Sequence, residues 1–214
     1  MPEIPQIGVW LIFFLPLGSF VAIAFIIRPF LDRYSRMAGV LTVSTVGLSL
    51  VLALWALQSL SEVSTLGNDW EAISWLTVGG VDVTVGVLLD PLTAIMLVVV
   101  TSVSLLVQVY STGYMKGDPG YARYFAYMSL FTASMVGVVI ASNIVQLYVF
   151  WELVGLCSYL LIGFWYQRPA AAAAAKKAFI VTRLGDFGFL LAVLYLVFNA
   201  GAVTGNVLDI ATIN

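Results

Sequence analysis

Six blocks of mostly apolar residues, each close to the length needed to cross a bilayer, constrain this chain more than any other feature. A helix rises 1.5 Å per residue, so about 20 apolar residues span about 30 Å of hydrocarbon. The blocks lie at about 8 to 27, 37 to 60, 91 to 110, 122 to 141, 144 to 165 and 178 to 198. We therefore predict an all-α membrane helix bundle with about six transmembrane helices.

The composition excludes several classes of protein. Of the 214 residues, 62% are hydrophobic and 9% are charged, whereas about 25% are charged in ordinary soluble domains. The chain has no histidine and a single cysteine, Cys157, so it offers neither an intrachain disulfide nor the usual ligands of haem or zinc. Nucleotide-binding loops and basic stretches interleaved with aromatics are absent from the sequence. We expect no cofactor or redox centre on this chain, and neither nucleic acid nor nucleotide as a direct partner.

Local signals refine three of the boundaries. Asp90 can cap the free amides of a helix whose first residue is Pro91. Gly79 and Gly80 lie between alternating residues in the longest loop, about 61 to 90, which predicts a short hairpin outside the membrane. The alanine run at 170–175 has high helix propensity and is expected to begin the helix of the last span.

The positive charges predict the orientation of the chain. Lys and Arg accumulate on the cytoplasmic side of membrane proteins. Eight of the nine cations fall in three alternate loops, and the opposite loops carry acids without any cation. These eight are Arg28, Arg33, Arg36, Lys116, Arg123, Arg168, Lys176 and Lys177. Both ends are therefore predicted on the outer side of a multi-pass protein, which we assign to a bacterial plasma membrane.

Three charged residues remain inside the predicted spans once caps and loop residues are set aside, namely Glu152, Arg183 and Asp186. Such a residue costs at least about 2.5–3.5 kcal/mol on insertion scales, so it needs a partner, a water-filled cavity or a neutral form. Arg183 and Asp186 are spaced for an ion pair on one face of a helix. Counted from the predicted span ends, Arg183 and Glu152 differ by roughly 10 Å in depth. Glu152 is thus predicted to lack a cation within these residues.

Two interpretations of Glu152 remain open at this point. It can be a protonated or hydrogen-bonded structural acid at a helix contact, or a site that gains and loses a proton. The pair Arg183 and Asp186 is equally open, because a local ion pair that joins helices would have the same spacing as a functional one. Gly155 and Gly163 are expected to be close-packing positions between helices.

Two long motifs carry a resemblance to a known family. They are the stretch 150–166, FWELVGLCSYLLIGFWY, and the stretch 176–186, KKAFIVTRLGD, supported by Leu89-Asp90-Pro91-Leu92. Together they resemble the L subunit (chain 5) of respiratory complex I, NADH:quinone oxidoreductase. The large subunit of multisubunit cation/proton antiporters and membrane subunits of related hydrogenases are also similar. The sequence Gly-Leu-Cys-Ser-Tyr within the first motif favours the respiratory subunit.

The resemblance implies that the chain is part of a proton-translocating subunit, which couples quinone reduction elsewhere in the complex to proton pumping. In the family, the acid of the fifth helix, here Glu152, sets the proton affinity of a lysine on the seventh, and other membrane subunits of the complex are neighbours. Family members run to many hundreds of residues, so residues 1–214 are expected to be an N-terminal transmembrane part of such a subunit. The alternatives are a sodium/proton antiporter subunit and a membrane scaffold whose charges only join helices.

Overall fold

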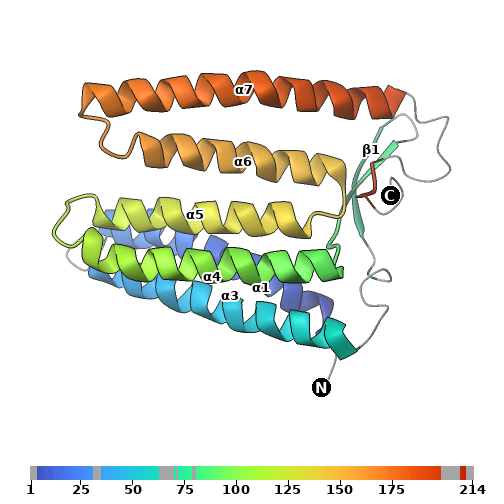
Figure 1. Ribbon diagram of the computed structural model, residues 1–214, viewed down its shortest axis with the longest axis horizontal. Helices are drawn as coiled ribbons and strands as arrows, with labels where there is room; N and C mark the ends of the chain where they lie inside the picture. The colour runs from blue at the N-terminus through green and yellow to red at the C-terminus, as the bar shows by residue number, and fades with distance from the viewer. Residues whose placement is uncertain are drawn as a thin grey trace. The chain divides into compact units, whose positions relative to one another are not determined.

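Six long apolar helices dominate the computed structural model, which describes residues 4–30, 35–62, 70, 72–78, 81–198 and 208–210 (Figure 1). Each of the six is long and apolar enough to cross a membrane. Many large apolar side chains are exposed on them, such as Phe25, Leu106 and Leu184, which is the pattern of helices that use lipid as their solvent. The prediction of an all-α, multi-pass membrane bundle is confirmed.

The chain divides into two compact units, of which the first comprises Met1–Leu66 and Leu89–Val136. Within this unit α3 packs against both α1 and α4. The helices are α1 (Gln6–Ala22), η1 (Ile23–Ile27), α2 (Arg28–Phe30), α3 (Arg36–Glu62), α4 (Pro91–Tyr114) and α5 (Tyr121–Ile140), whose last residues belong to the second unit. The segment η1 is a π-helical turn that joins α1 to α2 in one span, Gln6–Phe30.

Buried hydroxyl and amide groups connect the helices of the first unit. Ser129 of α5 donates to the carbonyl of Pro16 in α1 at 2.8 Å and is also hydrogen-bonded to Ser19. Gln108 of α4 donates to Thr132 of α5 at 3.2 Å. In an apolar solvent such bonds help to hold helices together, because an unpaired polar group would be costly. They fix α5 against α1 and α4.

The second unit, Gly67–Leu88 and Gly137–Asn214, contains a hairpin and two helices. These are β1 (Ile73–Val78), β2 (Val81–Val85), α6 (Ile144–Ile162) and α7 (Pro169–Phe198). The strands pair antiparallel with Val78 opposite Val81, which confirms the predicted hairpin, although its glycines at 79 and 80 lie outside the described residues. Gln146 of α6 accepts from the Gly86 amide at 3.1 Å and donates to its carbonyl at 3.0 Å, which anchors the hairpin to α6.

Two helix starts follow from side chains that cap free amides. Asp90 accepts a hydrogen bond from the Thr93 amide at 2.6 Å, with a proline in the first turn of α4, as predicted. Asn143 caps α6 in the same way by accepting from the Val145 amide at 2.8 Å. The last helix, α7, begins at Pro169, so the alanine run opens it as predicted. The helix starts nine residues before the apolar block that begins near 178.

Candidate functional site

The three ionisable residues inside the spans meet between α6 and α7. The guanidinium of Arg183 forms an ion pair with the carboxylate of Glu152 on α6. Its Nη1 also lies 3.4 Å from Oδ2 of Asp186, one turn along α7, and its Nη2 donates to the backbone carbonyl of Glu152 at 3.0 Å. One cation therefore lies between two carboxylates that come from different helices.

The prediction that Glu152 lacks a cation, and that Arg183 lies too far from it, is wrong. The predicted depth of Arg183 is measured from the start of the apolar block near 178, whereas α7 itself starts at Pro169. From the turn that joins α6 to α7, Glu152 lies about 15 Å along α6 and Arg183 about 21 Å along α7 at 1.5 Å per residue. A long arginine side chain covers the remaining difference. The ion pair between Arg183 and Asp186, which their three-residue spacing predicts, is present.

Neighbouring aromatic and glycine residues position the charged groups. The indole of Trp151 donates to Oδ1 of Asp186 at 2.8 Å, and the Arg183 guanidinium lies 4.7 Å from the centre of the Phe179 ring. A Cβ added at Gly155 would lie 3.3 Å from Nη2 of Arg183. The predicted close-packing role of Gly155 is thus confirmed, since its missing side chain leaves room for the guanidinium.

The position of Trp151 as a hydrogen-bond donor was not foreseen from the sequence. Aromatic residues are frequent in membrane helices, and this one precedes Glu152 directly, so its side chain leaves α6 in a different direction. What could have revealed it is the need of a buried Asp186 for a donor in addition to an arginine shared with another acid. Tryptophan supplies such a donor without adding charge.

Burial and charge together define what this cluster can do. The Asp186 side chain is 9% exposed, while the Glu152 and Arg183 side chains are each 26% exposed. With both acids ionised the cluster carries one net negative charge, because Arg183 offsets one of the two carboxylates.

The described residues contain no group of three or more His, Cys, Asp or Glu side chains that could hold a metal ion. Cys157, the single cysteine of the chain, is buried in α6 as a thiol. The chemistry that the described part of the chain presents between α6 and α7 is thus that of acids, an arginine and an indole.

Two family models match the chain. Residues 75–125 match the model of the NADH-ubiquinone oxidoreductase (complex I) chain 5 N-terminus. Residues 141–213, which contain the charged cluster, match the transmembrane model described as NADH:quinone oxidoreductase/Mrp antiporter. Together the two matches cover most of the chain after the first two spans.

Curated relatives agree with these models. A NAD(P)H-quinone oxidoreductase chain 5 of Synechocystis sp. is 44% identical over 199 residues, which is 90% of this chain and 28% of the relative. The chloroplastic subunit 5 of Nephroselmis olivacea is 45% identical over 94% of this chain and 31% of the relative. The chain thus spans less than a third of the length of these two relatives.

Solved structures show the same fold. A chain of the Mrp complex from Dietzia sp. DQ12-45-1b has a TM-score of 0.68 and 26% identity, and the match covers 91% of this chain and 19% of that one. A chain of an archaeal membrane-bound sulfane sulfur reductase has a TM-score of 0.69 at 18% identity, covering 87% of this chain and 36% of that one. The helix arrangement is therefore shared beyond the quinone oxidoreductases.

Proposed function

This chain belongs to the complex I chain 5 family, and on that premise we propose that it takes part in proton translocation by a membrane-bound quinone oxidoreductase. The observation that carries the proposal is the cluster of Glu152, Arg183 and Asp186, in which the Arg183 guanidinium lies between the two carboxylates. No redox step is assigned to this chain; quinone reduction takes place on other subunits, which are its partners in the membrane.

In this proposal Glu152 is the group that gains or responds to a proton. The family resemblance places a lysine on the helix that follows α7, so Glu152 has two alternative cations, that lysine and Arg183. When Glu152 pairs with Arg183, the lysine loses its counter-charge and releases its proton; when Glu152 turns to the lysine, Arg183 remains with Asp186. Such a switch changes proton affinity through charge alone. The loops rich in Lys and Arg face the side from which protons are taken.

The test is the substitution Glu152→Gln in the complete complex. Vesicles that contain the assembled complex are assayed for NADH oxidation by quinone and for acidification with a pH-sensitive dye. Removal of the ionisable group should lower the protons moved per NADH oxidised, because the amide has the same shape but no charge to exchange. Proton movement at the normal ratio in fully assembled vesicles would falsify the role of Glu152.

Asp90→Asn is a matched control for the loss of a carboxylate. Asp90 lies at the first turn of α4, where an asparagine can still cap the helix amides. This variant should assemble and pump as the unchanged complex does. A loss of pumping as large as that of Glu152→Gln would show that the assay reports acid removal in general. Asp186→Asn is measured for assembly, and failure to incorporate the subunit would assign Asp186 a structural role.

A second candidate function is exchange of a cation for protons without a redox partner. The match of residues 141–213 to a model that also describes Mrp antiporters, and the similarity to a chain of an Mrp complex, favour it. A sodium gradient imposed on vesicles in the absence of NADH and quinone distinguishes the two. Proton movement driven by sodium would support the antiporter, and its absence together with NADH-driven pumping would support the oxidoreductase.

A further inference from the structure

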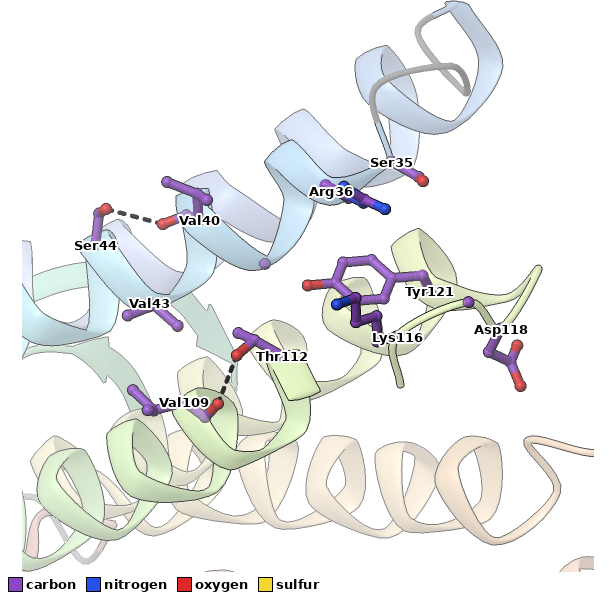
Figure 2. A pocket seen from close by; sticks show the side chains of 12 residues that line it. Ser35, Arg36, Val40, Val43, Ser44, Val109, Thr112, Lys116, Asp118 and Tyr121 are labelled. Carbon is purple, nitrogen blue, oxygen red and sulfur yellow. Dashed lines mark hydrogen bonds between the residues drawn. The ribbon is translucent and has the colours of Figure 1, made fainter. Parts of the chain in front are cut away.

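A cavity of about 680 Å³ lies at one end of α3 and α4, beside the turn that leads into α5 (Figure 2). It is contained in the first unit and shares no residue with the charged cluster of α6 and α7. Arg36, the first residue of α3, and Lys116, just after the end of α4, both line it. Figure 2 shows these two side chains and Tyr121 at one end, with Val40, Val43 and Val109 toward the other.

The cations of this cavity have no acidic partner within the described part of the chain. Neither the Arg36 nor the Lys116 side chain forms an ion pair or a hydrogen bond with any residue that the structure describes. The acid that lines the cavity, Asp118, accepts a hydrogen bond from the Gly120 amide at 2.6 Å, and its carboxylate points away from both cations in Figure 2. Among the residues that the structure describes, no acid is paired with either cation of this cavity.

Tyr121 adds a fixed hydroxyl group to the two charges. Its ring is 8% exposed and lies against Gly39 of α3, where a side chain would occupy the position of the phenol oxygen. The hydroxyl forms no hydrogen bond with a described residue. It can donate to an acceptor within the cavity.

The cavity lies at the depth of a lipid headgroup. It is at the terminus of two candidate spans, and the last turn of α4 carries the stacked pair Tyr110 and Tyr114, which are 71% and 60% exposed. Exposed tyrosines of this kind mark the boundary between membrane and water. Val40, which is 69% exposed, opens the apolar end of the cavity outward. A ligand bound here can have its charged end at Arg36 and Lys116 and its apolar end along the helices.

We propose that this cavity binds the phosphate group of an anionic phospholipid, with one acyl chain along the valines. Clefts with basic side chains between membrane helices suit such headgroups, and each cation near the surface favours an anionic lipid by about fivefold. A phosphate ion from solution shares the headgroup chemistry but leaves the apolar end of the cavity unused. The two sources are therefore separable by experiment.

The test uses the full chain in the assembly to which it belongs, extracted in mild detergent and stripped of lipid. Native mass spectrometry then measures binding of phosphatidylglycerol and of phosphatidylcholine with the same acyl chains. The pair of substitutions Arg36→Gln and Lys116→Gln should lower the preference for phosphatidylglycerol by about 25-fold, about fivefold for each cation. Arg36→Lys with Lys116→Arg should keep most of the preference.

Lys176→Gln with Lys177→Gln is the matched control, because it removes two exposed cations from α7, outside the cavity. It should leave the preference unchanged, and far-UV circular dichroism should show equal helix content in all variants. Equal preferences in the cavity variant and in this control would overturn the proposal. So would competition by inorganic phosphate as strong as that by phosphatidylglycerol, which would assign the cavity to a soluble anion. Neither result depends on proton pumping.

Discussion

Replacement of Arg183 by methionine tests the charged cluster most directly. Methionine keeps an unbranched apolar stem but removes the guanidinium. The substitution therefore deletes the ion pair with Glu152, the 3.4 Å contact with Asp186 and the 3.0 Å bond to the Glu152 carbonyl. The two carboxylates then face each other without a cation from the described residues.

The expected cost follows from burial. Removal of one partner of a buried ion pair costs about 3–5 kcal/mol, because the remaining charge is left uncompensated. Glu152 and Arg183 lie within helices long and apolar enough to cross a membrane, where water does not screen the remaining charge. We expect Arg183→Met to lower the free energy of unfolding by about 3–5 kcal/mol.

The assay is reversible unfolding in mixed micelles with an increasing fraction of SDS, followed by far-UV circular dichroism. The triple variant Arg183→Met, Glu152→Gln, Asp186→Asn provides the second measurement. It removes the uncompensated charges together with the cation, and replacement of all partners is usually close to neutral. The triple variant should therefore recover at least half of the stability lost in the single variant.

Two results would refute this reasoning. If Arg183→Met changed the free energy of unfolding by less than about 0.5 kcal/mol, as a surface substitution does, the cluster would not hold α6 and α7 together. If the triple variant were less stable than the single one, the destabilisation would come from lost packing rather than from uncompensated charge.

Three further substitutions, read out by the same unfolding assay, test individual contacts. Trp151→Phe removes the indole donor of Asp186 and should cost about 1–3 kcal/mol, the penalty of an unsatisfied buried acceptor; no cost would mean that water replaces the donor. Asp90→Ala should lower the free energy of unfolding by about 1 kcal/mol through loss of the α4 cap. Asp90→Asn is its control and should lower it less, because asparagine can also cap a helix. Gly137→Ala should cost about 1–3 kcal/mol, because the added Cβ would lie 2.6 Å from the Phe150 ring. Gly188→Ala is its matched control: a Cβ there has no atom within 4 Å, so this substitution should be neutral or stabilising by up to about 1 kcal/mol.

The parts of the fold that depend on local chemistry could be predicted from the sequence. The number of spans follows from the length of apolar blocks, and the start of α4 follows from Asp90 and the proline after it. The hairpin follows from alternation around two glycines. In each case the determining residues are neighbours in the chain, so the free energies involved can be assigned without knowing the tertiary structure.

The candidate site could be predicted only in part, because it depends on the register of α7 against α6. Glu152, Arg183 and Asp186 were identified by the cost of charge in hydrocarbon, and the proximity of the last two by their spacing. The pairing of Glu152 with Arg183 requires the length of α7 and the reach of an arginine. The apolar block near 178 begins nine residues after α7 does. Measuring depth from that block shifts a residue by about 14 Å along the axis, which is enough to separate the two partners. The donor role of Trp151 depends on the same register.

The π-helical turn at Ile23–Ile27 gives the first span a tolerance to insertion and deletion that the other spans lack. A turn of this kind accommodates one more residue than regular α-helix does. Deletion of a single residue there would return the segment to the ordinary bonding pattern, while the buried face of Gln6–Ala22 and the arginine that follows the turn keep their directions. Elsewhere in the bundle the same deletion would rotate every subsequent side chain by about 100°. Length variation among related chains should therefore concentrate at this turn.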